Sequence, residues 1–159
     1  MIVALLLAAA APTAVDAERA FAAHAQKVGQ WTAFRDYAEP TAVMFDPQAV
    51  WAHEFLKGRK DPPKPVEWWP AQSYVSCDGR TAVNTGPWSI RDRNQDGQFT
   101  TVWLKQPNGG WKWTYDAGEP LAKPLPRPRR AAVRRASCAN PRAIPAAYVA
   151  AARPTEQMA

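Results

Sequence analysis

The stretch Val66–Gly118 constrains the fold most, because it has the pattern of four β-strands joined by tight turns. It carries six of the eight tryptophans and is rich in Val, Thr and Tyr, which suit a pleated, half-buried surface. Asp-Gly and Asn-Gly dipeptides in the intervening turns readily supply the positive φ angles of hairpins. The predicted strands are Trp68–Cys77, Arg80–Arg91, Gln98–Gln106 and Trp111–Asp116. Successive hairpins predict an antiparallel meander.

Two details of this stretch predict its shape. Side chains alternate between the faces of a strand, so Trp111, Trp113 and Tyr115 are expected on one face and Asp116 on the other. Gly86-Pro87 interrupts the second strand, and proline cannot donate to the ladder. A bulge or bend is therefore predicted there, and it would curl the sheet.

The segment before the sheet is predicted to be mainly helical. Asp16–Gly29 places apolar residues at helical spacing and ends at a glycine, and Gln30–Ala38 continues as a second, shorter helix. Ala42–Phe45 is a short strand candidate and Pro47–Gly58 a short helix. Helices followed by an antiparallel sheet predict an α+β fold.

The positive charge of this chain belongs to its C-terminal part. The 159 residues are 47% hydrophobic, which suits one domain with a real core. Residues 1–122 hold 12 Lys and Arg against 13 Asp and Glu, whereas residues 123–159 hold 8 against 1. The sequence pI near 9.6 therefore does not indicate a nucleic-acid-binding domain, and no nucleic-acid partner is predicted.

The N-terminus has the pattern of a secretory signal peptide. Ile2–Ala11 is a ten-residue apolar run, shorter than the roughly 20 residues that span a bilayer. Cleavage is predicted after Ala14 or Ala17, although no Lys or Arg precedes the run. The alternative is a buried N-terminal helix or strand. The predicted organisation is a signal peptide over residues 1–17, an α+β domain over 18–118 and a Pro/Arg-rich tail over 119–159, in a periplasmic or secreted protein.

The two cysteines, Cys77 and Cys138, match neither a zinc-binding spacing nor a Cys-x-x-Cys motif. In an oxidising compartment they can pair, so we predict a disulfide that ties the tail to the sheet. The two histidines lie far apart and no carboxylates cluster with them, so no metal site or cofactor is predicted.

The order of elements resembles the cone-shaped α+β fold of the nuclear transport factor two-like superfamily, which includes SnoaL-like cyclases and ketosteroid isomerases. Asp16–Phe45, with YAEPTAVMF, resembles the helices and first strand of that fold. Arg80–Trp88, RTAVNTGPW, resembles its glycine-containing strand, and Gly109–Gly118, GGWKWTYDAG, its Trp-rich closing strand. The resemblance implies helices packed on the concave face of a curled sheet, around a mostly apolar pocket.

Two functions are consistent with such a pocket. The first is non-catalytic binding of a small apolar or aromatic molecule, with a homodimer formed through the sheet as a further expectation. Its ligand-binding candidates are tryptophans, for which core packing is the alternative role: Trp68, Trp88, Trp103 and Trp113. The second is an isomerase or dehydratase, since the resemblance implies a carboxylate base and an enolate-stabilising group. Its candidates lie near the predicted pocket mouth: Tyr37, Asp46, His53 and Glu54.

The arginines of the tail have two interpretations. Arg129-Arg130 and Arg134-Arg135 can contact an anionic membrane surface, or the tail can be a solubilising linker.

Overall fold

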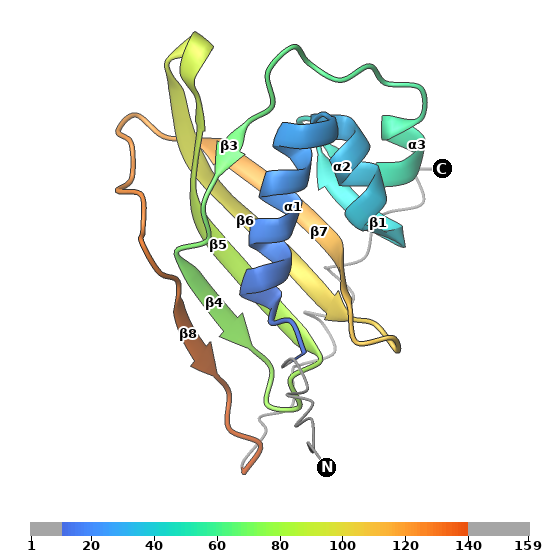
Figure 1. The fold of residues 1–159 in the computed structure, drawn as a ribbon, viewed down its shortest axis with the longest axis vertical. Helices are drawn as coiled ribbons and strands as arrows, with labels where there is room; N and C mark the ends of the chain where they lie inside the picture. The colour runs from blue at the N-terminus through green and yellow to red at the C-terminus, as the bar shows by residue number, and fades with distance from the viewer. Residues whose placement is uncertain (1–10, 140–159) are drawn as a thin grey trace, which may run out of the picture.

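Two helices open the described part of the chain, which covers residues 11–139 of a computed structural model (Figure 1). α1 (Ala14–Val28) is capped by Thr13, whose hydroxyl accepts from the Asp16 backbone N–H while the Asp16 carboxylate accepts from the Thr13 N–H. This reciprocal pair satisfies backbone donors at the start of the helix. Gly29 ends α1 at φ 107°, a conformation that favours glycine, and α2 (Gln30–Tyr37) follows directly.

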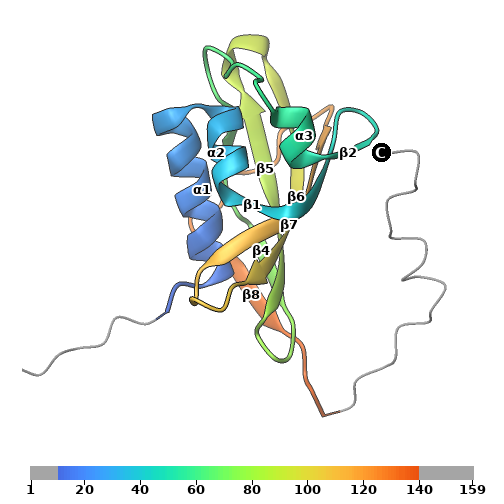
Figure 2. The same cartoon turned by 90° about the vertical axis from the view of Figure 1, so that its right-hand side faces the viewer.

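One curled, unclosed sheet forms the other layer, and α1 and α2 pack on its concave face (Figures 1 and 2). Its strands are β1 (Ala38–Phe45), β2 (Ala49–Trp51), β3 (Glu67–Trp68), β4 (Gln72–Val75), β5 (Thr81–Ile90), β6 (Gln95–Lys105), β7 (Trp111–Pro120) and β8 (Ala132–Arg135). The order is β2-β1-β7-β6-β5-β4-β8, and β3 pairs with β5. The short helices α3 (Ala52–Leu56) and η1 (Arg91–Arg93) complete the described elements. The predicted α+β class and curled sheet are confirmed.

The predicted meander is present in β4 to β7, which pair antiparallel in sequence order. Two pairings lie outside it, because β1 joins β7 and β8 joins β4 in parallel. Parallel neighbours require a connection that returns the chain to the same end of the sheet. For β8 the return is made along β7, which ends at the end of the sheet where β4 begins, and the eleven-residue link 121–131 then carries the chain across to the edge beside β4. The hairpin signals on which the prediction rested carry no information about such distant partners.

Of the bulge or bend predicted at Gly86-Pro87, the bulge is absent from the pairing of β5 with β6. β5 pairs with β6 without a register shift across both residues. The Pro87 carbonyl accepts from the Trp69 N–H at 3.0 Å, on the side away from β6. A strand residue directs its nitrogen and carbonyl to the same side, so the missing N–H of proline removes no bond to β6. Pro70 instead interrupts the predicted strand Trp68–Cys77 and divides it into β3 and β4.

The register shift of the sheet lies in β7, at Thr114. Trp103 pairs with Trp113, but the next residue along β6, Val102, pairs with Tyr115, which leaves Thr114 as an extra residue. A β-bulge of this kind shifts the alternation of side chains between the faces by one residue. Asp116 therefore joins Trp113 on the concave face, and Tyr115 lies on the other, 36% exposed. The predicted faces of Tyr115 and Asp116 are wrong for this reason.

The tail returns to the sheet and is fastened to it. The backbone N–H groups of Ala132 and Ala136 donate to the carbonyls of Ala71 and Val75, at 2.8 and 2.9 Å. Cys77 and Cys138 form the predicted disulfide, which closes a sequence separation of 61. A disulfide is typical of an oxidising compartment. The first ten residues of the predicted signal peptide and the tail from residue 140 onward lie outside the described residues. None of the helices over residues 11–139 is long and apolar enough to cross a membrane.

We expect the disulfide to stabilise the fold mainly by restricting the unfolded chain. Replacing both cysteines, as Cys77→Ser with Cys138→Ser, should lower the free energy of unfolding by roughly 4 kcal/mol for a loop of this length. Urea denaturation of the oxidised chain and the double variant measures the difference. Reductant should destabilise the native chain and leave the double variant unchanged; equal denaturation midpoints for the oxidised chain and the double variant would contradict the expectation.

Candidate functional site

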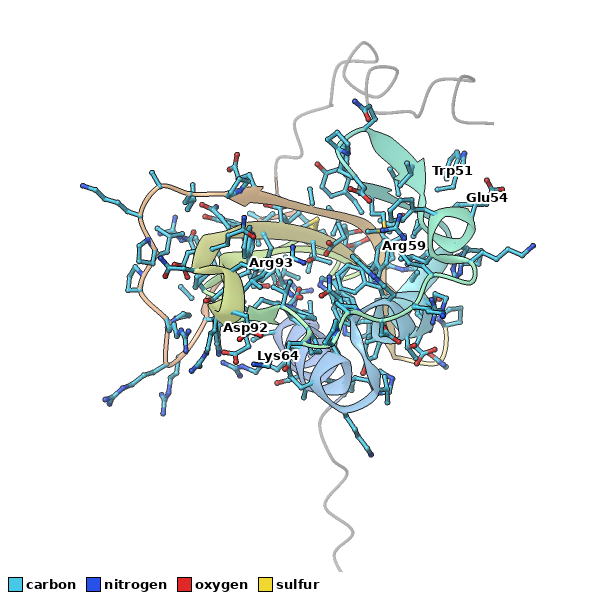
Figure 3. The ribbon with its side chains drawn as sticks, turned by 90° about the horizontal axis from the view of Figure 1, so that it is seen from above. Trp51, Glu54, Arg59, Lys64, Asp92 and Arg93 are labelled. Carbon is cyan, nitrogen blue, oxygen red and sulfur yellow. A yellow bond between two sulfur atoms is a disulfide. The ribbon has the colours of Figure 1, made fainter. Side chains whose placement is uncertain are left out.

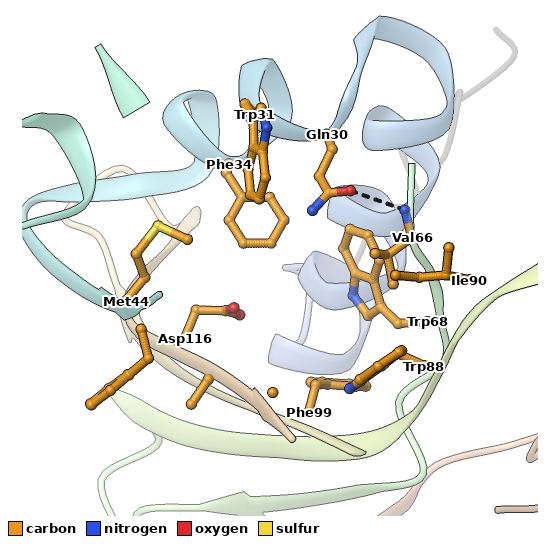
Figure 4. A pocket seen from close by; sticks show the side chains of 13 residues that line it. Gln30, Trp31, Phe34, Met44, Val66, Trp68, Trp88, Ile90, Phe99 and Asp116 are labelled. Atoms are coloured by element: carbon orange, nitrogen blue, oxygen red, sulfur yellow. Dashed lines mark hydrogen bonds between the residues drawn. The ribbon is translucent and has the colours of Figure 1, made fainter. Parts of the chain in front are cut away.

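A pocket of about 200 Å³ lies between α2 and the concave face of the sheet (Figure 4). Its walls are predominantly aromatic and aliphatic, and six large side chains form most of them: Trp31, Phe34, Met44, Trp68, Trp88 and Phe99. Pockets that take small molecules combine such walls with a few placed polar groups. Two polar side chains reach this one, Gln30 from α2 and Asp116 from β7.

Asp116 is the only ionisable residue among those that line this pocket. The β-bulge at Thr114 directs it inward, and the Thr101 hydroxyl donates to its carboxylate at 2.8 Å. Burial raises the pKa of Asp116 to about 7, against the opposing effect of that hydrogen bond. A carboxyl with this pKa exchanges protons near neutral pH, which suits it to proton transfer or to binding a hydrogen-bond donor.

A second carboxyl supports the pocket wall from behind. Glu18 of α1 is fully buried, and the Trp68 indole N–H donates to it at 2.9 Å. The Trp103 indole and the Asn84 carboxamide donate to its other oxygen at 2.6 and 3.1 Å. Burial raises the pKa of Glu18 to about 7 despite these three bonds, and the nearby Asp116 charge acts in the same direction. The orientation of Trp68 in the pocket is therefore held by a group outside the pocket.

The four predicted ligand-binding tryptophans separate into two pairs. Trp68 and Trp88 line the pocket. Trp103 and Trp113 have no exposed surface and lie in the core instead of on the lining. The indole N–H of Trp103 donates to Glu18, and the ring of Trp113 packs against Phe34 with centroids 5.9 Å apart.

The four catalytic candidates from the sequence are not brought together. Tyr37 packs against Phe21 in the core, and Asp46 is exposed and pairs with Arg59 at 3.4 Å. His53 is exposed with its ring nitrogen 3.1 Å from the Glu39 carbonyl oxygen. Glu54 lies at the exposed outer side of α3 (Figure 3). None of the four lines the pocket.

Sequence reasoning missed both polar groups of the pocket. Asp116 was assigned to the opposite face because the extra residue of the bulge cannot be read from the alternation. No sequence pattern marks a glutamine at the start of a helix, such as Gln30, as a pocket residue. Over residues 11–139, no group of three His, Cys, Asp or Glu side chains is placed to hold a metal ion.

A curled, mostly antiparallel sheet with helices over its concave face and a pocket between them is the arrangement of the nuclear transport factor two-like fold, and this chain has that fold. A candidate ketosteroid isomerase from Parabacteroides distasonis superposes with a TM-score of 0.53 at 16% identity, over 68% of this chain and 88% of that one. A nuclear transport factor 2-like superfamily protein from Salmonella enterica gives 0.50 at 19% identity, over 69% and 89%. A protein of unknown function from Pectobacterium atrosepticum, in the DUF3225 family, gives 0.51 at 12% identity, over 68% and 88%. No family model and no curated protein matches the chain.

The raised pKa of Glu18 predicts how stability depends on pH. The folded state binds this proton more tightly than the unfolded state, whose pKa is near 4.5. The contribution of Glu18 to stability is therefore complete below pH 4.5 and is lost as the pH rises to about 7. The loss should be about 3 kcal/mol, from 1.36 kcal/mol per pKa unit.

This loss should be measured in the Asp116→Asn chain, so that Asp116 does not titrate in the same range. Urea denaturation across this pH range gives the free energy of unfolding, and the chain that also carries Glu18→Gln is the matched control. As the pH rises, the free energy of unfolding of the chain with Glu18 should fall, relative to that of the control, by up to about 3 kcal/mol, and by less to the extent that the Asp116 charge contributes to the raised pKa of Glu18. Parallel curves would show that Glu18 does not titrate in this window.

Proposed function

We propose that this chain is an exported small-molecule-binding domain whose pocket holds one apolar or aromatic ring against Asp116. The observation that carries this proposal is a single half-buried carboxyl in a pocket whose walls are predominantly aromatic and aliphatic. The size of the pocket supports it, since an engineered apolar cavity of about 150 Å³ in another protein binds benzene. A pocket of about 200 Å³ accommodates one ring with small substituents.

Export is proposed from two features together. The Cys77–Cys138 disulfide is typical of an oxidising compartment, and the apolar run Ile2–Ala11 is typical of a signal peptide. Cleavage after Ala14 or Ala17 would remove the Thr13 cap of α1 from the mature protein. The mass of protein recovered from the periplasm gives the cleavage position and tests export directly.

Two surface contacts are proposed in addition. Phe45 and Tyr115 form an exposed aromatic pair, with ring centroids 5.3 Å apart, where β1 meets β7. This pair supports a homodimer through the sheet, which analytical ultracentrifugation of Tyr115→Lys against the native chain would test. The exposed Arg134 and Arg135 of β8 support contact of the tail with an anionic membrane, which co-sedimentation with anionic and neutral vesicles would test.

Isomerase-type chemistry is the second candidate function, and the pKa of Asp116 near 7 favours it. A carboxylate in a water-poor pocket can remove a proton next to a carbonyl group and return it elsewhere on the molecule. The fold of the comparison structures is compatible with either function and decides neither.

Binding is tested with a pair of one-ring probes, benzyl alcohol and toluene, which differ by a hydroxyl group. Ionised Asp116 is the stronger acceptor, so the affinity for benzyl alcohol should rise roughly threefold to tenfold as the pH passes from about 6 to about 8. Toluene should show no such rise, and Asp116→Asn should abolish it. NMR titration measures both affinities. Equal pH profiles for the two probes, or a rise retained in Asp116→Asn, would contradict the role of Asp116.

Catalysis is tested with a one-ring β,γ-unsaturated ketone, whose conversion to the conjugated isomer is followed by absorbance. If the chain is an isomerase, Asp116→Asn should slow the conversion at least about 100-fold, because it removes the general base. Asp46→Asn, which removes an exposed carboxylate outside the pocket, should leave the rate unchanged. No conversion by the native chain would leave binding without catalysis as the function.

A further inference from the structure

Gln30, the first residue of α2, directs its carboxamide into the pocket from the helix side (Figure 4). The residue is only 9% exposed, and its Oε1 accepts from the Val66 backbone N–H at 3.1 Å. A backbone N–H can only donate, so this bond fixes which end of the carboxamide is the oxygen. The NH2 group therefore points away from Val66, toward the space enclosed by the pocket (Figure 4).

The Nε2 group of Gln30 has no acceptor among the described residues. The only hydrogen bond of its side chain over residues 11–139 is the one from Val66. This NH2 group is not among the fully buried side-chain atoms without a partner, so it is accessible from the pocket and can donate to a partner there. An acceptor atom carried by a bound molecule would supply that partner.

The backbone around Gln30 is held in place from a distant part of the chain. The Asp61 carboxylate accepts from the backbone N–H groups of Trp31 and Thr32 and from the Thr32 hydroxyl. These bonds satisfy the free donors at the start of α2, as a capping side chain does. With Val66 holding its oxygen and Asp61 holding the following backbone, the Gln30 donor is positioned before any ligand arrives.

The charge of the lining limits what can bind. Lys and Arg are absent from the residues that line this pocket, and Asp116 is the only group there that ionises. An anionic ligand would meet a carboxylate of the same sign with no cation to offset it, which is unfavourable in a poorly hydrated site. The acceptor that pairs with Gln30 therefore belongs to a neutral group such as a ketone, amide or ester.

We propose that Gln30 determines the ligand class of this pocket: neutral one-ring molecules with a carbonyl-type acceptor at one end and a hydroxyl or similar donor at the other. Gln30 enters from the helix side and Asp116 from the sheet side, with aromatic walls between them (Figure 4). The acceptor of the ligand binds Gln30, its ring lies against the aromatic walls, and its donor binds Asp116. This inference rests on the proposed function, that the pocket binds a single ring.

The test compares three probes that share the hydroxymethyl group: benzyl alcohol, para-(hydroxymethyl)acetophenone and para-(hydroxymethyl)benzoate. The native chain should bind the acetophenone roughly threefold to tenfold more tightly than benzyl alcohol, as one added neutral hydrogen bond predicts. The benzoate, of nearly the same shape but anionic, should bind more weakly than the acetophenone. NMR titration measures all three, and the carboxamide N–H signals of Gln30 should shift further with the acetophenone than with benzyl alcohol, which has no acceptor at the end that faces them.

Gln30→Glu is the matched variant, because it keeps the shape and the acceptor for Val66 but replaces the NH2 donor with an oxygen. An acidic residue also suits the first turn of a helix, so the variant should fold as the native chain does. It should lose the preference for the acetophenone over benzyl alcohol when both carboxyls are ionised. The two affinities are therefore compared above about pH 8, because a second carboxylate raises the pKa of Asp116 and weakens benzyl alcohol binding near pH 7.

The outcomes separate this inference from the function on which it rests. Failure of every probe to bind the native chain would overturn the proposed function and this inference with it. Binding of benzyl alcohol without a preference for the acetophenone, or with the same preference in Gln30→Glu, would overturn only the role of Gln30. A benzoate that binds as tightly as the acetophenone would overturn the restriction to neutral ligands.

Discussion

The buried carboxylate of Glu18 is the interaction on which the arrangement of helix, sheet and pocket depends. It comes from α1 and accepts from Trp68 of β3, Trp103 of β6 and Asn84 of β5, so one side chain joins the first helix to three strands. A charge buried this completely is costly, and removal of any one donor leaves it less compensated. The three bonds therefore favour one position of α1 over other ways of packing an apolar helix face on the sheet, and that position sets the rear wall of the pocket.

The front of the pocket depends on one extra residue in β7. Without the bulge at Thr114, the alternation of the strand would place Asp116 on the outer face and Tyr115 in the pocket. The pocket would then present a phenol in place of a carboxyl that titrates near pH 7. The kind of chemistry available at this site is thus decided by backbone register as much as by residue type.

Turn dipeptides, strand-like composition and helical spacing were sufficient to predict the class of fold, most elements and the disulfide, because these features act over a few residues or follow from a pair of cysteines. The parallel positions of β1 and β8 could not be predicted in this way, since they depend on chain segments that meet only after folding. Trp68 and Trp88 were predicted as pocket residues on the same grounds as Trp103 and Trp113. What separates them is the depth of each strand position beneath the helices, which composition does not encode. Asp116 and Gln30 were not predicted as pocket residues. A register shift in β7 directs Asp116 into the pocket. The backbone N–H of Val66, far away in the sequence, orients the Gln30 carboxamide.

Glu18 and Asp116 also act on each other, because each carboxylate disfavours the charge of the other through a medium that screens poorly. A ligand that donates a hydrogen bond to Asp116 favours its ionised form. The added negative charge then raises the pKa of Glu18 and favours its protonation. A protonated Glu18 is a weaker acceptor for the Trp68 indole than an ionised one. Occupation of the pocket and the strength with which its rear wall is held are therefore linked through charge, and the linkage is reciprocal, since protonation of Glu18 in turn favours the ionised Asp116 that a hydroxyl-bearing ligand requires.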